Sequence, residues 1–125
     1  MLVADDDADI LNLVSFRLER SGYEVIRACN GVEALEVAQQ RLPDLAVLDV
    51  MMPGLDGYTV TSKLRGSEAT RSMPIILLTA RAQAEDVARG LEAGADEYVK
   101  KPFDARDLRA RVERLLAGRL RPLGL

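Results

Sequence analysis

The sequence predicts an α/β domain in which a parallel sheet is covered by helices on both faces. Two observations carry this prediction. Five short apolar or β-branched runs alternate with five segments whose apolar residues recur every three or four positions. Glycine and proline fall between these segments, where they end helices or allow turns. The expected strands are Leu2–Ala4, Glu24–Ala28, Leu45–Leu48, Ile75–Thr79 and Glu97–Val99.

Each expected helix has one apolar face. Residues three or four positions apart lie on the same side of a helix, so apolar residues at that spacing cover a buried sheet. Five helices that each follow a strand give a doubly wound (βα)5 arrangement with right-handed crossovers. The expected faces consist of Ile10, Val14 and Leu18; Leu35, Ala38 and Leu42; Val60 and Leu64; Val87 and Leu91; and Leu108, Val112 and Leu115.

The composition fits a single domain. The chain has 125 residues and 13.7 kDa, of which 48% of the residues are hydrophobic, so one core is expected. We expect the domain to span residues 1–117, with a C-terminal tail or linker stub at 118–125. The net charge is -3 and the basic residues are scattered, so no direct binding to nucleic acid is expected.

Several classes of protein are excluded or disfavoured by missing residues. Cys29 is the only cysteine and histidine is absent, which excludes an intrachain disulfide and a Ser/His or Cys/His catalytic pair. A zinc site is excluded for the same reason. No basic and apolar leader precedes the first run, and no run approaches the roughly 18 residues of a membrane span. A cytoplasmic protein without a membrane partner is therefore expected.

Polar side chains follow four of the five expected strands. The carboxyl ends of parallel strands meet at one edge of the sheet, where open α/β sheets bind their ligands. Three acids follow the first run, one acid follows the third, a threonine ends the fourth, and a lysine lies just past the fifth. In chain order these residues are Asp5, Asp6, Asp7, Asp49, Thr79 and Lys101.

These residue types together suit phosphoryl chemistry. Gathered carboxylates repel one another unless a cation lies among them, and oxygen ligands suit Mg²⁺. Lys101 and Thr79 add an ammonium group and a hydroxyl donor for phosphoryl oxygens, and a carboxylate such as Asp49 can act as the nucleophile. Taken singly, each feature has an ordinary explanation, such as a helix N-cap for the acidic run. Their conjunction on one edge favours a site.

Four segments resemble the signature segments of the response-regulator receiver domain of two-component signalling. They are "MLVADDDADI", "LAVLDVMMPGLDG", "PIILLTA" and "GADEYVKKPF", and the resemblance runs in order from about Met1 to Leu116. It implies a flavodoxin-like sheet of order 2-1-3-4-5. It also implies phosphoryl transfer from a sensor histidine kinase, or a phosphotransfer protein, to an aspartate of this chain.

The resemblance assigns the acidic residues. Asp49 matches the phosphoacceptor and also a ligand of Mg²⁺. Asp6 matches the direct carboxylate ligand, Asp5 the acid that usually acts through metal-bound water, and the backbone carbonyl of Met51 the third protein ligand. Asp7 has no assigned ligand role, so a helix N-cap is expected there.

The resemblance also assigns the switch residues. Thr79 matches the switch hydroxyl, and Lys101 the lysine that contacts the phosphoryl group. Tyr98 matches the aromatic residue whose rotamer reports phosphorylation. Ala80 is small and leaves room for the phosphoryl group. The family often has a cis peptide bond before the residue that corresponds to Pro102.

Partners and rival functions complete the expectations. An output domain beyond this chain and a homodimer formed on phosphorylation are expected, the latter as in receivers of the winged-helix transcription-factor subfamily. We expect a switch that turns over no external substrate. The alternatives are an aspartyl-phosphate phosphatase, although Met51 replaces its usual second acid, and a pseudo-receiver or flavin-binding module. The expected dimer face consists of Arg89, Asp96, Glu97, Asp107 and Arg111.

Overall fold

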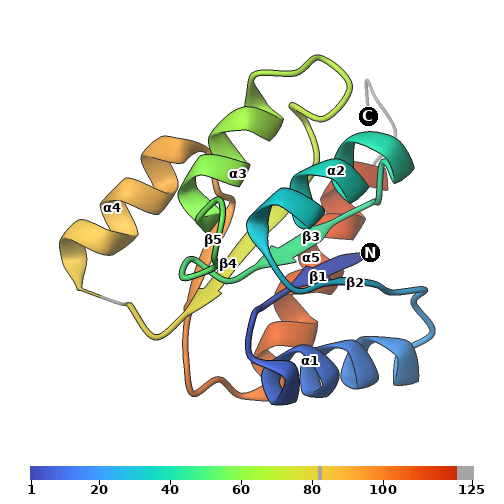
Figure 1. Cartoon of the computed structure of the whole chain (residues 1–125). Coiled ribbons are helices and arrows are strands. Elements are labelled where there is room, and N and C mark those ends of the chain that lie inside the picture. The colour runs from blue at the N-terminus through green and yellow to red at the C-terminus, as the bar shows by residue number, and fades with distance from the viewer. Residues whose placement is uncertain (82, 121–125) are drawn as a thin grey trace.

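Five parallel strands form one sheet of order β2-β1-β3-β4-β5 in the computed structural model, which describes residues 1–81 and 83–120 (Figure 1). The predicted fold class and strand order are confirmed. Pairing is in register, with Ala4 opposite Leu48 and Leu48 opposite Leu77, so the ends of β1, β3 and β4 lie side by side. The strands are β1 Leu2–Ala4, β2 Ile26–Ala28, β3 Ala46–Leu48, β4 Ile75–Thr79 and β5 Glu97–Lys100.

A helix follows each strand, and a polar side chain caps the start of each of the first three helices. Asp7 accepts hydrogen bonds from the backbone N–H of Asp9 at 2.9 Å and of Ile10 at 3.3 Å, which confirms it as an N-cap. Asn30 and Asp56 cap the next two helices in the same way. The helices are α1 Ala8–Arg20, α2 Gly31–Arg41, α3 Gly57–Arg65, α4 Ala84–Ala93 and α5 Ala105–Leu120.

The sheet separates two apolar layers. On one face, Val3, Val47 and Ile76 pack with residues of α1 and α5; on the other, Leu2 and Leu48 pack with residues of α2 and α3. Alternate residues of a strand point to opposite faces, so both sets are buried although each strand is only three to five residues long. Within the described ranges, no helix combines the length and apolar character of a membrane span.

Some predicted boundaries differ from the structure. β2 begins at Ile26 and not at Glu24, because β1 supplies only Leu2–Ala4 as pairing partners. Leu42 was expected on the apolar face of its helix. It lies just beyond α2 with a left-handed φ of 45° and is 50% exposed. α5 continues to Leu120, three residues past the expected end of the domain, and residues 121–125 of the expected tail lie outside the described residues.

Two glycines fix the loop that follows β3. A Cβ atom at Gly57 would lie 2.5 Å from the carbonyl oxygen of Asp49, and one at Gly31 would lie 1.8 Å from the carbonyl oxygen of Leu55. The Gly57 N–H also donates to the carbonyl of Val50 at 2.9 Å. The start of α3 therefore packs directly on the backbone of the strand end that carries Asp49.

Candidate functional site

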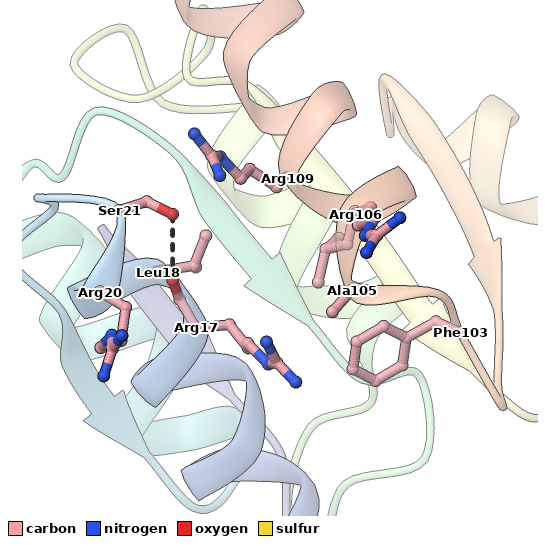
Figure 2. Close-up of a pocket in the computed structure, with 9 residues that line it drawn as sticks. Arg17, Leu18, Arg20, Ser21, Phe103, Ala105, Arg106 and Arg109 are labelled. Atoms are coloured by element: carbon pink, nitrogen blue, oxygen red, sulfur yellow. Dashed lines mark hydrogen bonds between the residues drawn. The ribbon is translucent and has the colours of Figure 1, made fainter.

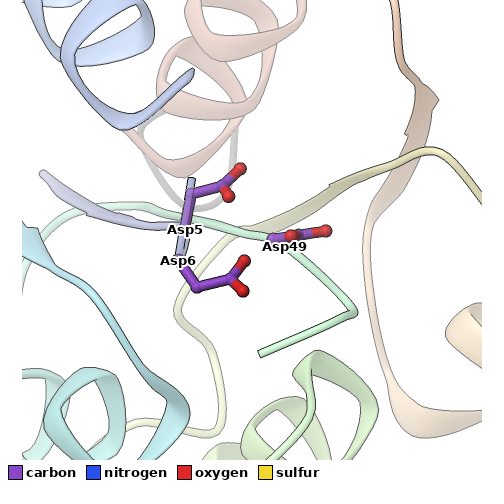
Figure 3. A group of neighbouring side chains, drawn as sticks. All are labelled: Asp5, Asp6 and Asp49. Carbon is purple, nitrogen blue, oxygen red and sulfur yellow. The ribbon is translucent and has the colours of Figure 1, made fainter. Parts of the chain in front are cut away.

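Three carboxylates gather at the carboxyl edge of the sheet. One oxygen each of Asp5, Asp6 and Asp49 lies within 4.8 Å of the others, with Asp5 and Asp6 just past β1 and Asp49 just past β3 (Figure 3). Asp5 and Asp49 are buried, whereas Asp6 is exposed. Three oxygen donors open to solvent on one side are a donor set that suits Mg²⁺, which retains several of its water ligands.

Burial and a like charge act together on Asp49. Desolvation raises the pKa of the Asp49 carboxyl, and the nearby charge of Asp5 raises it further, while Lys101 acts in the opposite direction. The backbone N–H of Met51 lies 3.4 Å from Asp49 Oδ1. The carboxylate of Asp49 therefore lies in a site where the negative charges of the acids outnumber the positive charge of Lys101.

Lys101 reaches into this cluster from the end of β5. Its Nζ lies 2.7 Å from Asp5 Oδ2 and 3.5 Å from Asp49 Oδ2, and its side chain is 16% exposed. Burial lowers the pKa of Lys101, but the hydrogen bond to Asp5 and the charge of Asp49 outweigh burial, and the net shift is upward. Lys101 is thus a charged counter-ion shared by two buried acids. The peptide bond between Lys101 and Pro102 is cis.

The end of β4 places a hydroxyl at the same edge of the sheet as the acids. Thr79 is buried, and its Oγ1 accepts a hydrogen bond from the backbone N–H of Arg81 at 3.2 Å. Since Leu48 pairs with Leu77, the strand end that carries Thr79 adjoins the one that carries Asp49. Ala80 is exposed, immediately after β4. The sequence-based list did not include Arg81, whose guanidinium lies 3.6 Å from the sulfur of exposed Met51.

Tyr98 lies on β5, and its hydroxyl contacts the loop after β4 and the start of α3. Its hydroxyl donates to the backbone carbonyl of Arg81 and lies 3.1 Å from the hydroxyl of Tyr58. Burial and the hydrogen bond with Tyr58 raise the pKa of Tyr98 above its ordinary value. Tyr58 had no place among the predicted site residues, because an aromatic residue near the start of an apolar helix is typical of a core position.

The residues of the expected dimer face are engaged within the chain. Arg111 of α5 lies 2.5 Å from Glu97 of β5 and 3.0 Å from Asp107. The contact with Glu97 joins β5 to α5. Asp96 accepts from Arg65 at 3.0 Å and from the backbone N–H of Ile75. Arg89 on α4 lies over the ring of Tyr58 and forms no pair with these acids.

A separate pocket lies between α1 and the start of α5 (Figure 2). Its volume is about 310 Å³, and its walls contain four arginines and no acidic residue. Ser21 donates a hydrogen bond to the carbonyl of Arg17 at its rim. None of its residues belongs to the carboxylate cluster, so the two features are distinct. The arginines are Arg17, Arg20, Arg106 and Arg109.

Comparisons with known proteins agree with this geometry. The family model described as "Response regulator receiver domain" matches residues 1–113. The chain is 45% identical over 116 residues to the DNA-binding dual master transcriptional regulator RpaA of Synechocystis, and 48% identical over 116 residues to the alkaline phosphatase synthesis transcriptional regulatory protein PhoP of Bacillus subtilis. Each match covers 93% of this chain and 48% of the relative. The chain therefore spans about half the length of these two relatives.

A solved structure agrees over nearly the whole chain. The signal receiver domain of a signal transduction histidine kinase from Syntrophus aciditrophicus superposes with a TM-score of 0.89 at 36% identity, covering 99% of this chain and 94% of that one. The expected absence of nucleic-acid binding gains no support, since one relative is named as DNA-binding. The match of the family model over residues 1–113 includes every residue of the carboxylate cluster, and this chain belongs to the response regulator receiver domains of two-component signalling.

Proposed function

We propose that Asp49 is the phosphoacceptor of this receiver domain and that Mg²⁺ supports the reaction. The observation that carries the proposal is the buried Asp49 carboxylate, which lies in a cluster with Asp5 and Asp6 and 3.5 Å from the Lys101 ammonium. A buried acid with two acidic neighbours serves no purpose in a core, where it costs stability. The same arrangement suits a nucleophile whose reaction brings in further negative charge.

The chemistry needs no general base from this chain. A carboxylate oxygen of Asp49 forms a bond to phosphorus while the bond between phosphorus and the donor breaks, and the leaving group keeps that electron pair. With a sensor kinase as the donor, the leaving group is the imidazole of a phosphohistidine. Lys101 neutralises charge on the phosphoryl oxygens, and the Thr79 hydroxyl donates to one of them. Exposed Ala80 leaves space at the same strand end.

The residues present fit a divalent cation. Asp5, Asp6 and Asp49 supply carboxylate oxygens, and the backbone carbonyl of Met51, in the loop after β3, is the further ligand we propose. Bound Mg²⁺ would supply positive charge for the phosphoryl oxygens. Tyr98 would then sense the change at Thr79 through the intervening residues.

The partners that we propose follow from the family and from the relatives. A sensor histidine kinase or a phosphotransfer protein supplies the phosphoryl group in the cytoplasm, and an output domain reads the face of α4, β5 and α5. Both relatives named above are transcriptional regulators about twice as long as the aligned segment. The domain takes part in its own phosphorylation and dephosphorylation, and turns over no external substrate.

The metal site is tested by replacing Asp6 with asparagine. We expect Asp6→Asn to raise the Kd for Mg²⁺ by about tenfold or more, because an amide oxygen is a weaker ligand than a carboxylate. Isothermal titration calorimetry measures the change. Asp7→Asn is the matched control: it removes the same charge from the adjacent residue and keeps a good N-cap, so its Kd is expected to stay near that of the parent. Equal affinities for Asp6→Asn and the parent would remove Asp6 from the ligand set.

We also propose that the phosphorylated domain dimerises through Arg89, Asp96, Glu97, Asp107 and Arg111. The proposal is supported by the network in which Arg111 joins Glu97 and Asp107, because pairs of both signs can be exchanged across a two-fold axis. Beryllofluoride, a phosphoryl mimic, is expected to shift sedimentation toward a dimer at micromolar concentration, and Arg111→Glu to abolish the shift. Arg109→Glu, on the same helix, is the control. A monomer in both states contradicts the proposal.

A further inference from the structure

A chain of hydrogen bonds leads from Thr79, at the carboxylate site, to helix α3. The backbone N–H of Arg81 donates to Thr79 Oγ1 at 3.2 Å, and the backbone carbonyl of Arg81 accepts from the Tyr98 hydroxyl. The hydroxyl of Tyr98 lies 3.1 Å from that of Tyr58, the second residue of α3. The backbone of Arg81 thus joins Thr79 of β4 to Tyr98 of β5, and the Tyr98 hydroxyl joins this pair to Tyr58 of α3.

The donor and the acceptor of each of these hydrogen bonds can be assigned. The one hydroxyl proton of Tyr98 is used toward the Arg81 carbonyl, so Tyr58 must be the donor in the contact between the two hydroxyls. The Tyr58 hydroxyl also donates toward the carbonyl of Asp86 on α4 at 3.2 Å, so its one proton is shared between Tyr98 and Asp86. Thr79 accepts at the other end, which leaves its own proton free to donate. Hydrogen bonds aligned in this way strengthen one another.

The surrounding packing holds both tyrosine rings. Tyr58 is 4% exposed, and the Arg89 guanidinium lies 4.6 Å from the centre of its ring. A Cβ atom at Gly90 of α4 would lie 2.7 Å from Tyr98 Cδ2, so the ring of Tyr98 occupies the space that glycine leaves. The two hydroxyls therefore meet because α3, α4 and β5 each fix one part of the contact.

We propose that Tyr58 is a positioning residue of the switch: its hydroxyl holds Tyr98 on the Arg81 carbonyl, and Arg81 in turn holds Thr79 ready to donate to a phosphoryl group on Asp49. The inference rests on the proposed role of Asp49 and extends the switch to α3. Binding of a phosphoryl group at Asp49 and formation of the hydrogen bonds from Tyr58 to Thr79 then favour each other, because both require the same position of Thr79. Loss of the Tyr58 hydroxyl weakens binding at Asp49 without touching that site.

The test is Tyr58→Phe, which keeps the buried ring and removes only the hydroxyl. At fixed Mg²⁺ and fluoride, the affinity for beryllofluoride, followed by the ¹⁹F signals of the bound group, is expected to fall about fivefold, the value of roughly one net hydrogen bond. Ring signals of ¹³C-labelled Tyr98 are expected to show a second, less restrained environment. Tyr23→Phe is the matched control, because this substitution removes the same hydroxyl group from a tyrosine next to α1, outside the chain of hydrogen bonds.

A second variant tests the position of Tyr98 through its packing against α4. Gly90→Ala displaces the Tyr98 ring while leaving Tyr58 in place, and the same loss of beryllofluoride affinity is expected. Unchanged or tighter binding by Tyr58→Phe, with or without lower resistance to denaturant, would overturn the inference and leave Tyr58 a core residue. Failure of the parent chain itself to bind beryllofluoride would instead overturn the role of Asp49, so the two failures are distinguishable.

Discussion

Asp49→Asn is expected to reduce phosphoryl incorporation from acetyl phosphate and Mg²⁺ to background, whereas the parent chain gains one phosphoryl group. The asparagine side chain keeps the shape of aspartate but lacks the anionic oxygen that attacks phosphorus. No histidine is present to accept the group in its place. Intact-mass measurement after a fixed incubation gives the stoichiometry for both proteins directly.

The control must show that the loss is chemical and that the variant is folded. Asp9→Asn removes an exposed carboxylate on α1, outside the cluster, and is expected to label like the parent. Asp49→Asn is expected to resist denaturant at least as well as the parent in Mg²⁺-free buffer, because burial and Asp5 raise the pKa of Asp49 and its charged form costs stability. Labelling of a folded Asp49→Asn protein at the parental level would place the acceptor elsewhere.

The position of the carboxylates could be predicted because it depends on local patterns. An apolar run of three to five residues ends where a polar residue follows, and this is visible around Asp49 without any knowledge of its neighbours. The parallel order then brings the ends of β1 and β3 together. Asp5 and Asp49 are 44 positions apart in number, yet their oxygens lie within 4.8 Å.

The hydrogen bonds that join Tyr58, Tyr98 and Arg81 could not be predicted in this way. Tyr58 and Tyr98 are 40 positions apart, and their contact depends on how α3 packs against α4 and β5. A sequence pattern records that Tyr58 is apolar enough for a core, but it does not record which polar atom its hydroxyl meets. Arg81 could not be predicted from its side chain, because it acts through its backbone N–H and carbonyl, a pair that every residue type except proline carries.

The ion pairs near β5 show a related limit. The alternation of charge at Glu97, Asp107 and Arg111 suggested pairing between two molecules, but these residues are close enough to pair within one. Residues 107 and 111 are four apart on a helix, a spacing that favours an intrahelical pair as well as an exposed face. Charge patterning alone cannot separate these outcomes, because both use the same residues.

The counter-ion of the cluster gives the largest expected effect on stability. Removal of Lys101 leaves Asp5 and Asp49 buried without their shared partner. Breaking a buried pair costs about 3–5 kcal/mol; because Lys101 is partly exposed, we expect Lys101→Met to lower the free energy of unfolding by about 2 kcal/mol near neutral pH in Mg²⁺-free buffer. Phosphoryl incorporation is also expected to fall by about a hundredfold, since Lys101 no longer neutralises the phosphoryl oxygens.

The dependence on pH distinguishes this electrostatic effect from a loss of packing. Lys101 lowers the pKa of Asp49, so its removal raises that pKa further. A carboxyl whose folded pKa is raised contributes stability at low pH that is lost as the pH rises through that pKa. The deficit of Lys101→Met relative to the parent should therefore grow as the pH rises from the acid range toward neutrality. Lys101 itself stays protonated throughout, because its own pKa is shifted upward.

Chemical unfolding of Lys101→Met and of Lys100→Met at several pH values provides the measurement. Lys100 is the adjacent, exposed lysine of β5, so its replacement removes the same charge without reaching the acids. Its variant is expected to unfold like the parent at every pH, and Mg²⁺ is expected to recover part of the stability of Lys101→Met by binding only the folded protein. A deficit that is the same at low and high pH would mean that Lys101 stabilises the domain through its aliphatic stem and not through its charge.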